Sequence, residues 1–253
     1  MKNTGIQIAT HYKRIVFRNR RAFFFSLILP LVFYLLFTKV MNVGVPASYM
    51  KTWQLNYLVS MAVYSSLVSS VITVSNTLLE DQTQHFILFV RLTGSSRLRY
   101  YLTMLAVFLP QTILSIVVLG LTGTFVNQVS ISLTLWLIFV LLLPILSVPF
   151  VLIGILISLS AQPTLVNILN QIVMFSMAIV GGLWWPIDLL PSWLQTIGKA
   201  LPTYQISVII QEVLGKQAIE LSALLGLGIW TLLLTGFLVV SLRLMNLFER
   251  QTI

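Results

Sequence analysis

Six stretches of mostly apolar residues alternate with shorter polar stretches along this chain. They cover residues 23–41, 57–78, 102–126, 133–158, 165–180 and 221–242. Most of them reach the roughly 20 apolar residues that an α-helix needs to cross the hydrocarbon core of a bilayer, about 30 Å thick. The pattern therefore predicts an all-α integral membrane protein, with one domain of six transmembrane helices over residues 1–253.

Prolines interrupt several of these stretches. Pro30 predicts a kink in the first predicted span, and Pro110 lies inside the third. Pro144 and Pro149 both fall within residues 133–158. A proline has no N–H and its ring clashes with the preceding helical turn, so we expect this fourth span to be bent or broken.

The overall composition agrees with a membrane protein, and the placement of the charges predicts its orientation. Only 8% of the 253 residues are charged, against about 25% in an average soluble chain. If the N-terminus is cytoplasmic, the cytoplasmic pieces carry six, three, none and two Lys or Arg, which is eleven of the fifteen in the chain. Cytoplasmic loops are rich in Lys and Arg, so we expect a multi-pass protein of the cell membrane with both termini inside.

The N-terminal residues 1–22 combine six basic residues with interleaved apolar ones and contain no acid. This pattern is typical of an amphipathic interfacial helix, which either only sets the orientation or also contacts a cytoplasmic partner. The net charge of +9 is explained by orientation, so we expect the lipid bilayer as a partner and no nucleic acid.

Residues 79–101 form the only charged cytoplasmic segment between two predicted spans. A short helix is expected in its inner part, with Phe86, Phe89 and Val90 on one side, ended by Gly94 and Ser95. This helix is too short to cross a bilayer, so we interpret the segment as a structured cytoplasmic loop. The alternative is an ordinary loop that only fixes topology, but such a loop would not need the apolar middle.

Two of the predicted spans carry polar side chains in a pattern. Hydroxyls of the second span recur at steps of four, three and four residues, which places them on one helical face; they are Ser66, Ser70, Thr73 and Thr77. The fifth span begins with the amides Asn167, Asn170 and Gln171. Close helix packing, with hydroxyls bonded across the interface, explains the stripe; the other interpretation is that both sets line a substrate path.

Residues 181–220 are too apolar for an ordinary loop and too broken by proline for a spanning helix. Tryptophan favours the boundary between hydrocarbon and water, and two short helices, about 187–200 and 204–214, are expected to dip into the outer leaflet and return. The segment is either an aromatic anchor or an outer gate. The gate candidates are Gly181, Gly182, Trp184, Trp185, Pro186, Pro191, Trp193, Pro202 and Tyr204.

Catalytic and nucleotide-binding motifs are missing from the sequence. The chain has no cysteine, no H-E-x-x-H motif and no Asp, Glu, His, Arg or Lys in the middle of a predicted span. Gly215 and Lys216 lack the remaining residues of a phosphate loop, and His11 and His85 lie in the predicted cytoplasmic segments. We therefore expect neither an enzyme nor a metal or cofactor site, and any ATP hydrolysis must belong to another subunit.

The order of these features, with the run Gly-Gly-x-x-x-Pro-x-x-x-x-Pro-x-Trp-Leu followed by Leu-Pro-Thr-Tyr at residues 181–204, resembles the permease subunits of bacterial type-2 ABC exporters. The resemblance implies a dimer with a second copy or a sister permease, and two copies of a cytoplasmic ATPase that binds ATP and Mg²⁺. It also implies that residues 79–101 are the coupling segment. Its candidate coupling residues are Glu80, Asp81, Phe86, Phe89, Val90 and Arg91.

The function expected from this resemblance is ATP-driven export of an amphipathic substrate, such as a drug, an antimicrobial peptide or a lipid-linked molecule. The predicted path is apolar, with scattered hydroxyls and amides and no charge to match an ion. Two other functions fit six spans: a membrane-embedded enzyme, for which only serines without a base are present, and a non-transporting immunity or assembly protein.

Overall fold

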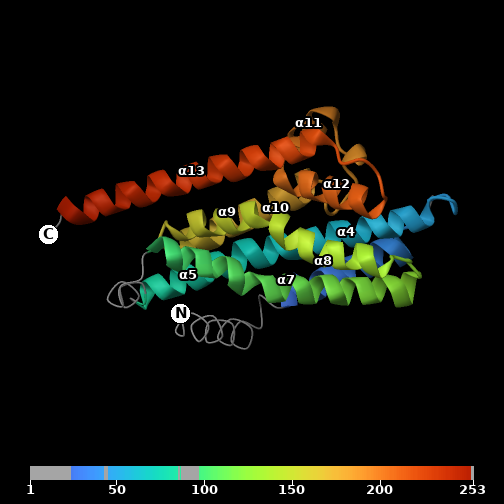
Figure 1. The fold of residues 1–253 in the computed structure, drawn as a ribbon, viewed down its shortest axis with the longest axis horizontal. Coiled ribbons are helices and arrows are strands. Elements are labelled where there is room, and N and C mark those ends of the chain that lie inside the picture. Colours follow the sequence, from blue (N-terminus) through green and yellow to red (C-terminus); the bar gives the residue numbers. More distant parts are fainter. Residues whose placement is uncertain (1–23, 43–44, 85, 87–96, 252–253) are drawn as a thin grey trace.

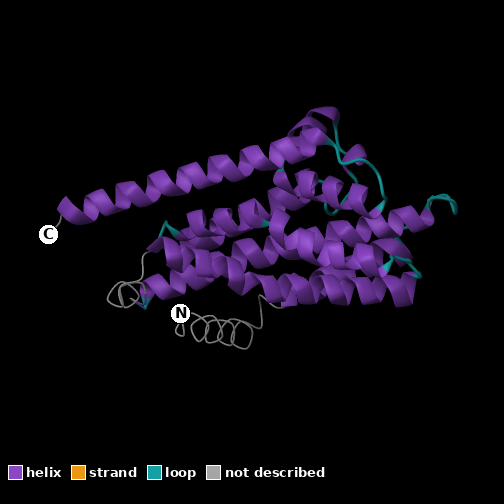
Figure 2. Cartoon of the chain, in the orientation of Figure 1, coloured by secondary structure: helices purple, strands orange, loops and turns teal. Residues whose placement is uncertain are grey.

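The computed structural model describes residues 24–42, 45–84, 86 and 97–251. The predicted interfacial helix at 1–22 and the residues Phe89, Val90 and Arg91 lie outside this described part. All secondary structure within it is helical (Figure 2). The helices are η1 (Phe24–Ile28), α3 (Leu29–Leu35), η2 (Leu36–Val40), α4 (Met50–Val68), η3 (Ser69–Thr73), α5 (Val74–Thr83), α7 (Arg97–Asn127), α8 (Leu133–Leu146), α9 (Val148–Ser158), α10 (Pro163–Val180), η4 (Ile187–Leu189), α11 (Ser192–Ala200), α12 (Pro202–Leu214) and α13 (Leu221–Gln251).

Five helical stretches in the described part are long and apolar enough to cross a membrane. They are Met50–Thr83, Leu109–Asn127, Leu133–Ser158, Pro163–Val180 and Leu221–Met245, and they match the second to sixth predicted spans. The first predicted span corresponds to a shorter apolar helix, Ser26–Val40. The all-helical membrane architecture is confirmed, while a count of six spans stays a prediction.

The second predicted span is the centre of the bundle. It runs without interruption through α4, η3 and α5, and it packs against α3, α7, α9, α10 and α12 (Figure 1). In its most apolar window 89% of the residues are buried, against 17% in α13. Helix α13 lies along the outside and contacts α9 and α12.

The central helix and α9 approach each other most closely at Gly154. A Cβ atom at this position would lie 2.7 Å from the carbonyl oxygen of Ser70 and 3.0 Å from that of Val71. Both carbonyls belong to η3, where the helix widens into a π-helical turn. Because lipid provides no hydrophobic drive between helices, small residues that let backbones approach hold such bundles together.

The predicted break in the fourth span is confirmed. Helix α8 contains Pro144 and ends at Leu146, and α9 begins with Pro149 in its first turn. Ser147 lies between them and donates its hydroxyl hydrogen to the carbonyl of Leu143 at 2.7 Å. Pro110, in contrast, lies inside α7 without ending that helix.

The turns of the described chain gather at the two ends of the bundle. The start of α4, the α7–α8 turn and the segment from Gly181 to Glu220 lie at one end, and the end of α5, the α9–α10 turn and the end of α13 lie at the other (Figure 1). Successive turns along the chain therefore alternate between the two ends of the bundle, as the sequence predicts for its outer and inner loops.

Candidate functional site

Residues 181–220, here named the Trp–Pro segment, follow α10 and fold as a turn, the short helix η4 and then α11 and α12. The sequence predicts its first helix at 187–200, but α11 begins only at Ser192. The reason is Pro191: Leu190 is extended, with φ −84° and ψ 154°, because a residue before proline is disfavoured in the α conformation. The second helix begins at Pro202, two residues before the expected start, where proline suits a first helical turn.

Trp184 fixes this segment to the bundle. Its ring lies edge-on to those of Phe33, Tyr64 and Phe175, at centroid distances of 5.4, 5.7 and 5.6 Å. The hydroxyl of Tyr57 donates a hydrogen bond to the Trp184 carbonyl at 2.6 Å. The segment is therefore attached to predicted spans 1, 2 and 5 at one point.

The tight turn before Trp184 depends on Gly182. Its φ of 75° is in the left-handed region, which glycine adopts without strain and other residues rarely do. The turn directs Trp184 inward and leaves the neighbouring Trp185 exposed, as Trp193 on α11 also is.

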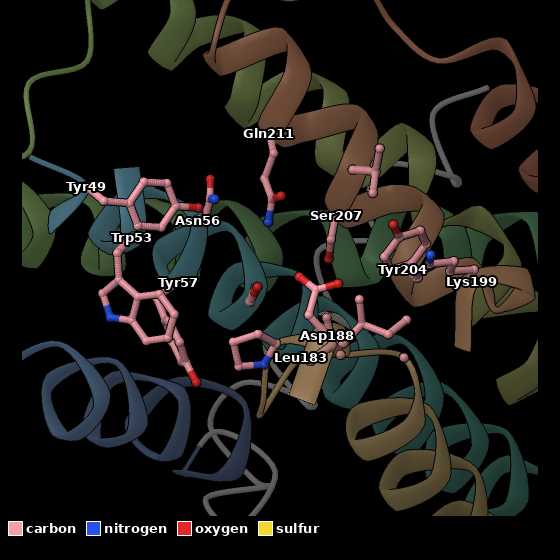
Figure 3. Close-up of a pocket in the computed structure, with 16 residues that line it drawn as sticks. Tyr49, Trp53, Asn56, Tyr57, Leu183, Asp188, Lys199, Tyr204, Ser207 and Gln211 are labelled. Carbon is pink, nitrogen blue, oxygen red and sulfur yellow. The ribbon is translucent and has the colours of Figure 1, made fainter. Parts of the chain in front are cut away.

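A cavity of about 240 Å³ lies between this turn, the start of α4 and α12 (Figure 3). Gly181, Gly182 and Pro186 line it, together with aromatic, amide, hydroxyl and charged side chains. These side chains are Tyr49, Trp53, Asn56, Tyr57, Ser60, Asp188, Lys199, Tyr204, Ser207 and Gln211. Three separated parts of the sequence thus form one partly polar site.

Charged groups meet the aromatic ones within this cavity. Figure 3 shows Asp188 in the middle of the labelled residues, with Tyr49 and Trp53 on one side and Tyr204 and Lys199 on the other. Burial raises the pKa of the Tyr204 hydroxyl, and the negative charges of Glu220, Asp188 and Glu212 raise it further. The Tyr204 hydroxyl therefore stays protonated near neutral pH and can donate a hydrogen bond.

The predicted coupling segment is described only at its two ends. Asp81, near the end of α5, is buried, and its carboxylate accepts a hydrogen bond from the hydroxyl of Tyr100 on α7. Phe86 packs beside Tyr100 with ring centroids 6.3 Å apart. Glu80 is half-buried and its carboxylate accepts a hydrogen bond from the Gln84 side-chain amide at 3.1 Å. The Asp81–Tyr100 hydrogen bond and the Phe86–Tyr100 contact thus join the two ends of the segment.

The hydroxyl stripe of the second span faces other helices of the same chain. Ser66, Ser70 and Thr73 are buried, and Thr77 is half-buried. Ser66 donates a hydrogen bond to the hydroxyl of Ser147 at 2.7 Å, across to the break between α8 and α9. In this conformation these side chains contact protein, and their assignment to a path stays a prediction.

The amides at the start of α10 divide between two faces. Asn170 is buried and its side-chain oxygen accepts a hydrogen bond from the Ser75 hydroxyl at 2.9 Å. Asn167 and Gln171 are exposed, on the same side as Ile168 and Ile172. Of the predicted path residues, Asn167 and Gln171 are therefore the two that are exposed.

Comparison with known proteins adds one decisive similarity. No protein-family model matches the sequence. The chain is 32% identical over 201 residues to a Bacillus subtilis (strain 168) protein named "Putative transport permease YvfS", and the match covers 78% of this chain and 80% of that protein. The chain belongs to the ABC-2 type transport permeases. It is therefore a membrane transport permease, which agrees with its long apolar helices.

Sequence reasoning missed most of the cavity of this permease, although a signal was present. Tyr49, Trp53 and Tyr57 recur at steps of four, which places three aromatic rings on one helical face. Tyr204 and Gln211, at a step of seven, likewise share a face of α12. Two such faces in different elements indicate a site only when the fold brings them together.

Proposed function

We propose that this permease is the transmembrane subunit of an ATP-driven exporter. A separate cytoplasmic ATPase, present in two copies, binds ATP with Mg²⁺ and supplies the energy, and a second permease copy or a sister permease completes the channel. Membership of the ABC-2 type permeases is the observation that carries this proposal.

The bond between Asp81 and Tyr100 supports a coupling role for the segment that they enclose. A force applied to this segment reaches α5 and α7 together, because the bond and the contact of Phe86 with Tyr100 join the two helices. Helix α5 is the last part of the central helix formed by α4, η3 and α5, which packs against most of the bundle. A small displacement by the ATPase would therefore be transmitted to the other helices as a rigid-body movement.

The exposed face of α10 is the part of the chain best suited to an amphipathic substrate. Asn167 and Gln171 offer amides there, beside the exposed apolar side chains of Ile168, Ile172 and Phe175. A path along Ser66, Ser70 and Thr73 would require packed helices to separate first. We propose that the substrate moves between α10 and the second permease subunit, and that the Trp–Pro segment closes the outer end as a gate.

Stimulation of ATP hydrolysis tests the proposal. We expect the adjacent reading frame to encode an ATPase subunit; the permease is purified with that subunit, and hydrolysis is compared with that of the ATPase alone. We expect Phe86→Asp and Phe89→Asp to abolish stimulation, because a charge replaces an apolar contact, and Phe86→Leu to retain it.

Assembly distinguishes the possible results. If the Asp variants assemble with the ATPase and stimulate it as the wild type does, the coupling assignment is wrong. If the permease binds no ATPase subunit at all, the exporter proposal itself fails.

A further inference from the structure

The segment that forms the cavity differs in charge from the rest of the chain. Three of the six acidic residues in the sequence, Asp188, Glu212 and Glu220, lie within residues 181–220, against two basic residues, Lys199 and Lys216. The whole chain, in contrast, carries a net charge of +9. This local excess of acidic over basic residues favours a ligand that carries a positive group.

Asp188 and Lys199 both line the cavity but do not neutralise each other directly. Among the described residues, neither the Asp188 carboxylate nor the Lys199 ammonium has a hydrogen bond or an ion pair. The cavity therefore presents one negative and one positive group to whatever enters it. A ligand with both an ammonium and a phosphate matches this arrangement.

The uncharged lining suits the same ligand. Tyr49 and Trp53 offer aromatic rings, with Tyr57 packed behind Trp53, and aromatic faces attract ammonium groups through the cation–π interaction. Ser207 is only 6% exposed, lines the cavity, and its hydroxyl has no hydrogen-bond partner among the described residues. Buried polar groups normally have partners, so the Ser207 hydroxyl is available to a ligand in the cavity.

The outside of the segment is apolar. Leu189 and Trp193 are 72% and 65% exposed, and Trp185 and Ile197 are exposed as well. Tryptophan beside exposed aliphatic side chains is typical of the level where headgroups meet hydrocarbon. The cavity itself, at about 240 Å³, is smaller than the roughly 300 Å³ at which pockets for drug-sized ligands begin. Its size suits a headgroup whose acyl chains stay outside.

We propose that the cavity binds the headgroup of a zwitterionic phospholipid, with the ammonium group at Asp188 and the phosphate at Lys199. The aromatic rings of α4 cover the headgroup, and the acyl chains lie along the exposed apolar residues of η4 and α11. The bound lipid holds the Gly181–Gly182 turn and η4 against α4 and α12. This site does not depend on ATP-driven export, because it involves the permease chain alone.

Native mass spectrometry of the full-length permease in detergent tests the site. The purified chain is titrated separately with phosphatidylethanolamine, which is zwitterionic, and with phosphatidylglycerol, which is anionic and has no ammonium. We expect tighter binding of phosphatidylethanolamine by the wild type. Asp188→Asn and Lys199→Gln should each weaken that binding by at least about tenfold, as expected for loss of one charge-assisted hydrogen bond.

Two further substitutions serve as matched controls. Glu212→Gln and Lys216→Gln remove the same charges from the same segment at residues that do not line the cavity, and they should leave binding within about twofold of the wild type, because neither side chain belongs to the site. Thermal unfolding shows whether each variant is folded. Wild-type binding by folded Asp188→Asn and Lys199→Gln would overturn the site, as would equal binding of both lipids or an equal loss in the controls.

A competition measurement distinguishes a lipid from a soluble compound with the same headgroup. Glycerophosphoethanolamine carries the ammonium and the phosphate but no acyl chains. We expect it to displace little phosphatidylethanolamine at an equal concentration, since the acyl chains contribute contacts outside the cavity. Full displacement at that concentration would overturn the lipid as occupant and assign the site to a soluble phosphoamine.

Discussion

At the scale of single residues, atomic contacts decide which of several similar residues are needed for helix packing. Gly154 is one of four glycines on α9 and α13, and its missing Cβ leaves room for the backbone carbonyls of Ser70 and Val71. Gly228 and Gly236, both on α13, have open space where a Cβ would be. The sequence alone does not separate these glycines, because the difference lies in the helix that packs against each.

We expect Gly154→Ala to destabilise the permease by about 1–3 kcal/mol, the usual effect of an extra carbon in a packed core. The carbonyl oxygens that the new carbon meets belong to backbone and cannot rotate away. Gly228→Ala is the control, and should leave stability unchanged or raise it by up to about 1 kcal/mol through helix propensity. Unfolding of both variants in the same detergent measures the difference; equal stability would show that α9 can move away from η3 without loss.

The tryptophans of the outer segment show the same dependence on contacts. The sequence predicts all of them for the membrane interface. Trp184 instead packs against Phe33, Tyr64 and Phe175 inside the bundle, while Trp193 is exposed. Composition identifies the kind of segment, and the tight turn at Gly182 determines which ring faces inward.

At the scale of elements, hydroxyl groups join helices where prolines interrupt them. Ser147 lies at the break between α8 and α9, donates to the carbonyl of Leu143 and accepts from Ser66 on α4, both at 2.7 Å. The break therefore has polar partners of its own, which is how membrane helices tolerate a proline. Ser66 belongs to the stripe that the sequence identifies, so packing accounts for at least this member of it.

A double-mutant cycle should measure the strength of this junction. We expect Ser66→Ala and Ser147→Ala to be coupled by about 0.6 kcal/mol, and at most about 1.7 kcal/mol, as found for interhelical hydrogen bonds in membrane proteins. The cycle of Ser66→Ala with Ser176→Ala, whose hydroxyl bonds within α10, is the control and should be additive within about 0.5 kcal/mol. Additivity in the Ser66–Ser147 cycle would mean that the contact does not hold the two helices together.

The sequence predicts the elements of this fold better than its site. Apolar runs mark the helices, and Pro144 with Pro149 marks the break, because both signals are local in the chain. The cavity brings Trp53 on α4 next to Asp188 and Ser207, which are more than a hundred residues away. The buried contact of Asp81 with Tyr100 likewise depends on how two helix ends meet. Such pairings follow from packing, which no local pattern encodes.

At the scale of the whole molecule, several helices of the described part leave apolar side chains uncovered, with α13 and α10 among them. Helix α13 exposes Leu225, Leu232 and Phe237, and α10 exposes Ile168 and Ile172. Soluble monomers rarely expose apolar patches of this kind, whereas lipid or a second permease subunit covers them in a membrane. The uncovered faces run along the length of the bundle, and its turns lie at the two ends (Figure 1). The bundle axis is therefore expected to cross the bilayer.

Single cysteines introduced into the turns should report on this orientation, because the natural chain contains none. Ser130→Cys and Gln217→Cys place exposed thiols at the end with the Trp–Pro segment, and Thr83→Cys and Gln162→Cys place them at the other end. The Lys and Arg distribution predicts that a membrane-impermeant maleimide labels the first pair in intact cells and the second pair only after permeabilisation. Labelling of the two pairs in the opposite order would reverse the orientation and place the predicted coupling segment outside the cell, away from any ATPase. If the two members of one pair differed, the turns at that end would lie on opposite sides of the membrane, and the number of spans between them would have to change.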